Sequence, residues 1–557
     1  MNEEALVVAG AFLALIVIIT LLGLGEKRRY REYLKNRIRG SFGKFQKDEI
    51  NPVRAESIPA YFTRHKTENS IDDITASDLE LDRLFSAMNL TYSSAGEELL
   101  YHSLRTPLFD EKELEARRER IGYYKDHKEE REKLQLVFGE IGKNERYSLY
   151  NYLEFAETLE ENRGLKLHFL APLLVLAAVG LIFFRTGLGL TVLITVIIVN
   201  MTWYFREKGR VEPYVSTLKR VNSEINGAKK LLAQSASLPA EERDEIRKLI
   251  SDMAGMRRGA GIVFSGDDRS GNPLSILWDY TNMVLHIDLI CFYRMYRQLI
   301  SHREEIDRLH ARLGSVEALI AVASFETALS DICIPVFDGH EAAQQIYHPL
   351  ITDPVKNSYD AKGCLLLTGS NASGKSTFLK TLAINQLLSQ CYGFACADEF
   401  HTAFHRIYTS MSLRDDLSGG ESYFMVEIRA MQRILEAGKR EGAQVACYVD
   451  EVLRGTNTVE RIAASSRILR SMAEMGFFTV AATHDIELTD LLEDVYENHH
   501  FEEEIKDGDV LFNYRLMNGK ATSRNAIRLL SVMGYDKKIV KEAEDLAEHF
   551  MEKGSWT

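Results

Sequence analysis

Apolar residues gather in three blocks in the first part of the chain, at 5–24, 167–184 and 188–204. The first block is long enough to cross a hydrocarbon core of ~30 Å, whereas the other two are marginal for spanning. Only residues 185–187 separate the second block from the third, so the pattern predicts a helical hairpin at 167–204. The alternative is a pair of core helices buried inside the protein.

Charged residues around these blocks indicate how they would lie in a membrane. Glu3 and Glu4 precede the first block, and a basic run that starts at Lys27 follows it. A cleaved signal peptide would have positive charge in front and a small-residue cleavage site behind, and this block has neither. The positive-inside rule places residue 27 onward in the cytoplasm. We therefore expect an anchor at 1–25 and, with about three transmembrane helices, a multi-pass protein of the cell membrane.

The segments between and after the blocks have helical periodicity. Residues 26–65 are basic and then polar, which is typical of a juxtamembrane linker. From about 72 to 163, and again over 205–255 and 275–330, apolar residues recur at helical spacing among charged ones. The sequence therefore predicts an all-α domain over 66–345, which the hairpin interrupts.

The pattern changes near residue 346. Short apolar runs at 364–367, 445–449 and 479–482 alternate with amphipathic helical segments. This alternation is typical of an α/β domain with a largely parallel sheet. The sequence predicts such a domain, with a cytoplasmic location, at 346–557.

Composition is consistent with several globular domains. The 557 residues are too many for one hydrophobic core, and the 45% hydrophobic and 27% charged content is ordinary for folded proteins. The net charge of −13 repels DNA phosphates on average, so a nucleic-acid contact would need a local basic surface. The six cysteines are scattered without a C-x-x-C pair, so neither a disulfide framework nor a zinc site is predicted.

A phosphate-binding motif follows the first predicted strand of the α/β domain. The sequence from Gly369 to Ser376 fits G-x-x-x-x-G-K-[ST], and a predicted helix continues from Thr377. Gly369 and Gly374 let backbone N–H groups curl round a phosphate, and the helix N-terminus adds its positive dipole end. Lys375 is predicted to reach the β- and γ-phosphates of ATP, and the Ser376 hydroxyl to ligate Mg²⁺.

The next two predicted strands end in candidate catalytic residues. Asp450 and Glu451 follow the run at 445–449, and His484 follows the run at 479–482. Asp450 would hold the Mg²⁺ shell, and Glu451 would orient or deprotonate the attacking water. Strands often end in acidic loops, so Asp450 and Glu451 alone are weak evidence of a catalytic site. The P-loop upstream makes this evidence strong. His484 is predicted to sense the γ-phosphate rather than to be structural.

Residues 417–421 read Leu-Ser-Gly-Gly-Glu and resemble the signature loop of ABC ATPases, which closes over the nucleotide of a partner subunit. Ser422 lies 47 residues after Lys375, which leaves no room for the helical subdomain that ABC transporters insert there. Three spans are also too few for a translocation pathway in each subunit. An ABC-type transport ATPase is therefore disfavoured.

Four motifs in this order resemble those of the MutS family of mismatch-repair proteins. The runs TGSNASGKST and DDLSGGESYFMVE resemble the family's TGPNMGGKST and DDLASGRSTFMVE, and DEVLRGTNT and ATH resemble its DEIGRGTST and ATH. They occupy residues 368–377, 415–427, 450–458 and 482–484. The stretch from about 519 to 550 is similar to the family's closing helix-turn-helix, which packs ATPase domains together. Residues 73–124 more loosely resemble its helical core and lever domain.

The resemblance implies a MutS/ABC-like P-loop NTPase that forms a homodimer with two composite ATP sites. The residues that would act within one subunit are Lys375, Ser376, Asp450, Glu451 and His484. Ser422 would reach the partner's γ-phosphate, and the loop at 454–458 would couple the two sites. Asn371 keeps the position of the family's P-loop asparagine.

The sequence also departs from the family pattern. Glu421 replaces a basic residue in the trans loop, and Pro354 stands where an aromatic residue would stack on adenine. The mismatch-reading domain with its Phe-x-Glu wedge has no counterpart, because residues 1–65 are predicted anchor and linker. The hairpin at 167–204 lies about where the family's levers carry their DNA-gripping clamp. Our hypothesis is that it replaces the clamp; the alternative is a truncated clamp beside an unrelated insertion.

Two functions follow from these expectations. The first is a membrane-anchored MutS-like ATPase that binds DNA in an ATP-dependent way. The alternative is an ATP-driven membrane mechanoenzyme, in which the lever helices act on the membrane or on a protein partner without DNA. A contiguous basic groove on the lever helices would favour the first, and a mixed-charge surface would favour the second.

Overall fold

The computed structural model forms two compact units. The described residues are 25, 28–46, 51–159, 164–264, 273–370, 373–411, 423–439, 444–506, 509–521, 527, 530, 533–553 and 555–556. The first unit comprises Met1–His65, Asn89–His102 and Arg120–Ser324, and the second comprises Lys66–Met88, Ser103–Glu119 and Phe325–Thr557. The predicted anchor at 1–25 lies outside the described residues except for Gly25. The predicted domain limits at 66 and 346 stay predictions.

Helices make up the described part of the first unit, as its apolar periodicity predicts. They are a helix over 28–41, α2 (Pro52–Ala55), α3 (Ala60–Arg64), α8 (Lys128–Ile141), α9 (Leu149–Glu157), α10 (Gly164–His168), α11 (Leu170–Phe184), α12 (Thr186–Gln234), α13 (Ala240–Asp252), α14 (Ala254–Arg257), α15 (Ala260–Val263), α16 (Pro273–Leu285) and α17 (Ile287–Ser301). The unit boundaries fall inside α6 (Ser94–Leu104), α7 (Glu111–Asp126) and α18 (Arg303–Ala328).

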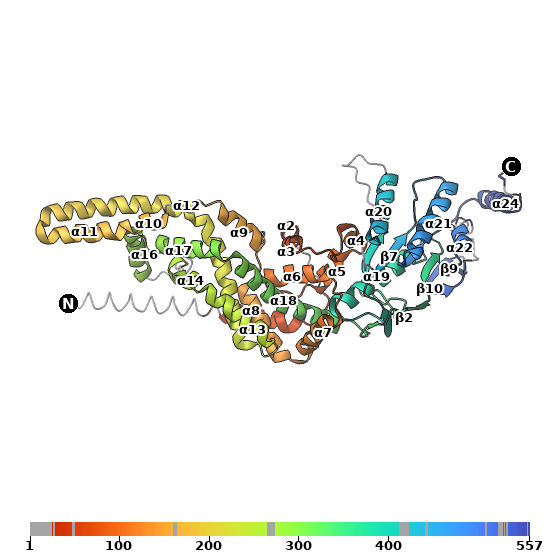
Figure 1. Ribbon diagram of the computed structural model, residues 1–557, viewed down its shortest axis with the longest axis horizontal. Helices are drawn as coiled ribbons and strands as arrows, with labels where there is room; N and C mark the ends of the chain where they lie inside the picture. The colour runs from red at the N-terminus through yellow and green to blue at the C-terminus, as the bar shows by residue number, and fades with distance from the viewer. Residues whose placement is uncertain are drawn as a thin grey trace. The chain divides into compact units, whose positions relative to one another are not determined.

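The helical hairpin is present, but its second helix does not end with the third apolar block at residue 204. This block is the first part of α12, a continuous helix of 49 residues, and α11 packs along it (Figure 1). Further along α12, Leu218, Val221 and Ile225 recur at helical spacing and are buried, and this part packs against α8, α9 and α13. The sequence changes there from apolar on all sides to amphipathic, and the helix continues through Pro213.

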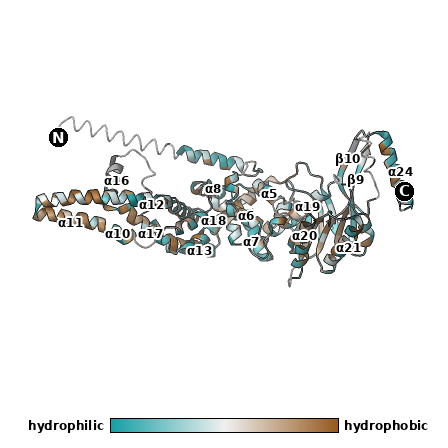
Figure 2. Ribbon diagram, turned by 90° about the horizontal axis from the view of Figure 1, so that it is seen from above, coloured by the Kyte–Doolittle hydropathy of each residue, from teal (hydrophilic) through white to brown (hydrophobic). Residues whose placement is uncertain are grey.

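The first part of α12 and its neighbour α11 expose most of their apolar side chains. Among the described residues, Leu165–Phe184 and Thr186–Gln234 are the two helices that are long and apolar enough to cross a membrane. Phe183 and Phe184 are 85% and 87% exposed, and Leu176 is 67% exposed. Figure 2 shows hydrophobic residues along both helices. A pair of buried core helices would have these side chains covered.

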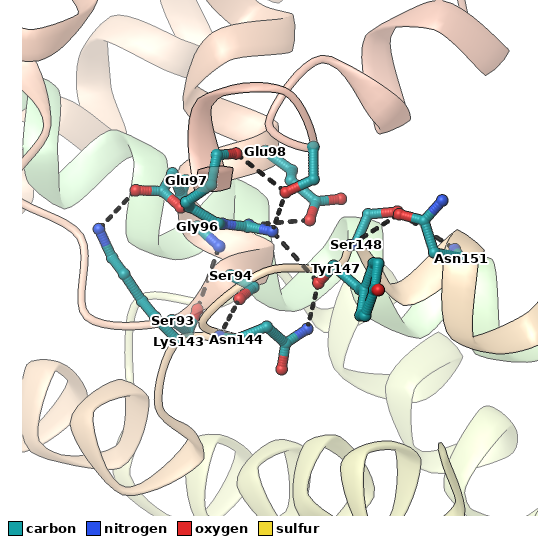
Figure 3. A network of polar contacts seen from close by, with 12 residues as sticks. Ser93, Ser94, Gly96, Glu97, Glu98, Lys143, Asn144, Tyr147, Ser148 and Asn151 are labelled. Carbon is teal, nitrogen blue, oxygen red and sulfur yellow. Dashed lines mark hydrogen bonds and ion pairs between the residues drawn. The ribbon is translucent and has the colours of Figure 1, made fainter. Parts of the chain in front are cut away.

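Charged side chains are buried where α2 and α6 meet. Arg54 is 5% exposed and donates hydrogen bonds to Glu97 at 2.8 Å and to Glu98 at 3.0 Å. Lys143 donates to Glu97 at 2.7 Å, and Figure 3 shows these two side chains directed at each other. Burying a charge is costly unless it is paired and hydrogen-bonded, so the four side chains depend on one another. This network fixes the segment around Arg54 to α6.

The described residues of the second unit form two sheets. The four-stranded sheet has the order β1-β5-β2-β3, and the six-stranded sheet has the order β10-β9-β4-β8-β7-β6. The strands are β1 (Val336–Phe337), β2 (Glu341–Ile346), β3 (Asn357–Ala361), β4 (Cys364–Thr368), β5 (Glu399–Thr402), β6 (Arg406–Ser410), β7 (Val445–Asp450), β8 (Phe478–Ala482), β9 (Tyr496–Lys506) and β10 (Asp509–Asn518). The helices are α4 (Asp73–Asp78), α5 (Leu81–Met88), α19 (Lys375–Tyr392), α20 (Tyr423–Ala437), α21 (Thr458–Glu474), α22 (Glu487–Leu491) and α24 (Lys537–Lys553).

The predicted α/β domain is confirmed. The three short apolar runs of the sequence form β4, β7 and β8, and every residue of these strands is buried. β9, β4, β8, β7 and β6 pair in parallel, and only the β9–β10 pair in this sheet is antiparallel. Strands buried on both faces read as continuous apolar runs, which is why the sequence revealed them.

Candidate functional site

Three neighbouring strands end at the same edge of the six-stranded sheet. β8 lies between β4 and β7, and its last residue, Ala482, is in register with Leu367 on one side and Asp450 on the other. The residues that follow these strands therefore meet at one edge. They are the P-loop after β4, Glu451 after β7 and His484 after β8. Ligands of open α/β sheets bind at the carboxyl ends of the strands.

The P-loop leads directly into α19. Gly374 precedes the helix with φ 105°, and Gly369 has φ 139°. A Cβ added to Gly369 would lie 2.6 Å from the carbonyl oxygen of Phe501, so the loop has no room for a side chain there. Backbone N–H groups of this turn and of the first turn of α19 are those that can bind a phosphate. The predicted Asn371 lies outside the described residues.

Lys375 is buried at the base of this loop. Its ammonium group donates hydrogen bonds to the carbonyl oxygens of Gly369 and Ser370, both at 2.8 Å. Burial lowers the pKa of Lys375 to about 8, and the nearby carboxylates of Asp450 and Glu451 oppose this shift. The side chain therefore stays mostly protonated at pH 7, as a ligand of phosphate oxygens must be.

The predicted magnesium ligands are in contact. The Ser376 hydroxyl donates to Oδ2 of Asp450 at 2.5 Å. A hydroxyl and a carboxylate side by side at the end of a P-loop are the oxygen ligands that Mg²⁺ takes, together with phosphates and water. These two side chains fit the ion on chemical grounds.

Glu451 is held from two sides. Its Oε1 lies 2.9 Å from Nε2 of His484, and its Oε2 lies 2.7 Å from Nε of Arg454. The hydrogen bond to His484 and the charge of Arg454 hold the pKa of Glu451 below its usual value, against the effect of burial. Nε2 of His484 is 3.4 Å from Nζ of Lys375, so the histidine lies between the P-loop and the carboxylate. The predicted grouping of these side chains is thus found in the structure.

A cavity of about 460 Å³ adjoins the P-loop. Its lining includes Tyr347, His348, Pro354, Gly374, Thr377 and Tyr514. Burial lowers the pKa of His348 to about 4, so the ring is neutral at pH 7. The Leu350 N–H donates to Nδ1 of His348 at 3.2 Å, which leaves the proton on Nε2. The cavity is thus mostly apolar, with a few polar groups, as small-molecule sites usually are.

Tyr514 was missed by sequence analysis, which looked for an aromatic residue at position 354. It lies at a bulge of β10 with φ 54°, and its ring is 3.1 Å from where a Cβ on Gly374 would be. Asn357 holds this bulge, because its side chain donates to the Tyr514 carbonyl at 3.0 Å and accepts from the Leu516 N–H at 2.8 Å. Asn357 is far from Tyr514 in the sequence, so no local pattern marks this contact.

Two other predicted elements are only partly described. Ser422 lies outside the described residues, and α20 begins immediately after it at Tyr423. Of the predicted helix-turn-helix at 519–550, the longest described element is the helix α24, on which Ile539, Leu546 and Phe550 are exposed. The roles of both in a dimer stay predictions.

The chain resembles known proteins over the region that contains this site. The family model MutS domain V matches residues 365–551. The DNA mismatch repair protein MutS of Thermus aquaticus is 28% identical over 292 residues, which are 50% of this chain and 36% of that protein. The DNA mismatch repair protein MutS 2 of Haloarcula marismortui is 28% identical over 294 residues, 47% of this chain and 30% of that protein. The chain thus matches about a third of the length of these relatives, and its C-terminal domain is similar to MutS domain V.

Proposed function

We propose that this protein hydrolyses ATP at the carboxyl edge of the six-stranded sheet. The observation that carries the proposal is the meeting of Lys375, Ser376, Asp450, Glu451 and His484 at this edge. Lys375 would bind the β- and γ-phosphates, and Ser376 and Asp450 would hold Mg²⁺, which neutralises phosphate charge when bound. Glu451 would orient the attacking water. As the new P–O bond forms, the bond to the β–γ bridging oxygen breaks, ADP takes the electron pair, and the water proton passes to Glu451 or to phosphate.

The cavity beside the P-loop would take the adenine base. Tyr514 supplies a flat aromatic surface next to Gly374, which is the function that the sequence assigned to position 354. The Nε2–H of His348 can donate to a ring nitrogen of the base. Thr377 lies on the same lining and joins the base cavity to the P-loop.

The test of the ATPase proposal is a pair of substitutions. Glu451→Gln keeps the shape of the side chain but removes its charge, so it is expected to bind Mg·ATP normally and to slow turnover by ~10²-fold or more. Lys375→Ala is expected to abolish ATP binding. Glu474→Gln, an exposed glutamate at the end of α21, is the control. Near-normal turnover in the Glu451 or the Lys375 variant would contradict the proposal.

We also propose that α11 and the first part of α12 insert into the cell membrane, and that the protein works as a dimer. The exposed apolar side chains of both helices support insertion, because water-exposed patches of this size are rare in soluble domains. Together with the block at 5–24 this makes about three spans, with the ATPase domain in the cytoplasm. The proposal of a dimer is based on the composite ATP sites that the resemblance to the MutS family implies.

A second candidate, the membrane mechanoenzyme, is favoured by the charges of the helical unit. Several of its cations pair with carboxylates: Arg39 with Glu132, Arg120 with Glu242, Lys230 with Glu140, and Arg312 with Glu245. A DNA-binding surface would present unpaired Lys and Arg to phosphates.

One experiment distinguishes the DNA-binding function from the membrane mechanoenzyme. ATPase rates of the purified full-length protein are measured in detergent with and without duplex, mismatched and branched DNA, at two salt concentrations, and again after reconstitution in lipid bilayers. Salt-dependent stimulation by DNA would support the MutS-like DNA-binding function. Stimulation by lipid but by none of the DNAs would support the mechanoenzyme.

A further inference from the structure

The turn that follows β7 has an unfavourable backbone conformation. Glu451 and Leu453 both have φ 58°, a region that residues with a Cβ rarely occupy. Such a turn persists only where its surroundings hold it, and it is often found at functional sites. The Glu451 N–H donates to the Ala482 carbonyl at 2.9 Å, which fixes the start of the turn to β8. The end of the turn needs a separate support.

That support comes from α20. Glu427 is 3% exposed, and its carboxylate accepts hydrogen bonds from the Arg454 N–H at 3.1 Å and from the Gly455 N–H at 3.2 Å. Phe424 lies against the same place, since a Cβ on Gly455 would be 3.1 Å from Cβ of Phe424. One buried carboxylate thus binds two successive backbone N–H groups, and the backbone of the turn cannot shift without breaking both bonds.

The side chain of Arg454 returns to the catalytic carboxylate. Its Nε lies 2.7 Å from Oε2 of Glu451, and its Nη2 donates to the Asp450 carbonyl at 3.0 Å. A planar guanidinium with two such contacts has a fixed orientation. Since His484 holds the other oxygen, both oxygens of Glu451 have a defined position. A carboxylate has about four lone-pair directions, so Glu451 keeps acceptors for a water molecule.

We propose that Glu427 is a positioning residue for ATP hydrolysis, which acts through Arg454 on Glu451. It holds the backbone of Arg454 and Gly455, and thereby places the guanidinium that orients the catalytic carboxylate. The inference rests on the proposed ATPase function and deepens it. Neither Glu427 nor Arg454 is assigned a contact with the reacting atoms, so their loss should reduce turnover without reducing nucleotide binding.

The test uses three variants of the full-length protein and a matched control. Glu427→Gln removes one acceptor and turns an amide group toward a backbone N–H. Arg454→Gln removes the guanidinium from a side chain that is 37% exposed, so the core is left intact. Arg454→Lys keeps the charge, but its single ammonium cannot reproduce both contacts. Glu436→Gln on α20, an exposed glutamate of the same helix, is the control.

Steady-state ATPase rates, Mg·ATP binding and thermal unfolding are measured for each variant. We expect kcat to fall about tenfold or more in all three variants, with KM and ATP affinity within about twofold of wild type. The kcat of the double variant Glu427→Gln with Arg454→Gln should be no lower than that of the worse single variant, since the two residues act as one unit.

Other results would overturn the inference. Normal kcat in Glu427→Gln, losses that add in the double variant, or full rescue by Arg454→Lys would each show that Glu427 does not act through the guanidinium contacts. An effect only on unfolding temperature, with kcat unchanged, would show that Glu427 has a structural role only. Wild-type protein that binds Mg·ATP but does not turn it over would instead overturn the proposed function itself.

Discussion

Individual residues of the proposed ATP site differ in how far the sequence could assign them. Lys375, Ser376, Asp450 and Glu451 belong to local motifs in which each residue type follows from the chemistry of phosphate and Mg²⁺. His484 also lies where its place at the end of a strand predicts. Tyr514 could not be assigned in this way, because it reaches Gly374 through a bulge held by a residue far away in the sequence. Long-range contacts of this kind leave no local pattern.

Tyr514 gives a prediction at this scale. Replacing it with alanine removes the aromatic surface beside Gly374 and is expected to raise KM for ATP about tenfold, the effect of losing one base-stacking contact. Tyr514→Phe keeps the ring and should stay close to wild type. Equal KM values for wild type and Tyr514→Ala, measured at saturating Mg²⁺, would place the base elsewhere.

At the scale of elements, the buried strands and the helical periodicity were predictable, because burial on both faces and amphipathic spacing are local signals. The length of α12 was not, since the apolar block ended at residue 204 while the helix continues to Gln234. Even Pro213 does not end it. The contacts of residues 66–88 and 103–119 with the C-terminal residues were equally unpredictable, because they are set by tertiary packing.

Three helices of the first unit meet at a buried histidine. His310 on α18 is fully buried, with Nδ1 3.1 Å from Glu224 on α12 and Nε2 3.5 Å from Glu98 on α6. Burial disfavours the charged ring, but the two carboxylates outweigh it and raise the pKa of His310 to about 10. The first unit therefore holds an imidazolium at neutral pH.

This histidine predicts a pH dependence of stability. The folded-state pKa lies above the ordinary value of about 6.5, so the stabilisation is complete below that pH and is lost as pH rises toward 10. Unfolding in denaturant is measured between pH 6 and 10, following the helical unit. The free energy of unfolding of wild type should fall across this range. That of His310→Gln should be lower at pH 6 and should change less with pH. If the free energy of unfolding depends on pH with the same slope in wild type and His310→Gln, the assignment is contradicted. The control is His127→Gln, at an exposed histidine.

The hairpin gives a second prediction for elements. Leu176 on α11 is exposed and would face lipid, so Leu176→Trp is expected to add a fluorescence signal that lipids brominated in their acyl chains quench. Ser216→Trp, on the part of α12 that packs on the helical core, should add a signal that these lipids do not quench. Equal quenching of the two added signals in reconstituted full-length protein would exclude insertion of the hairpin.

At the scale of the whole molecule, the proposed dimer can be tested by mixing inactive subunits. Lys375→Ala and Ser422→Ala should each be inactive as homodimers, because one lacks the cis lysine and the other the trans serine. In a mixed dimer one composite site is intact, so an equal mixture should recover roughly a quarter of wild-type turnover, as the symmetry of a two-fold dimer requires. A mixture that stays inactive after subunit exchange has been verified would argue against shared sites.

The continuity of α12 has a mechanical consequence. Its 49 residues form one rod of ~74 Å, with apolar side chains on all sides at one end and a packed face at the other. A continuous helix passes a tilt or a twist along its length. Pro213 interrupts the backbone hydrogen bonds only locally, and a proline is a place where a helix can bend. Replacing Pro213 with alanine would stiffen the helix. A glycine pair at the same point would uncouple the motions of its two ends.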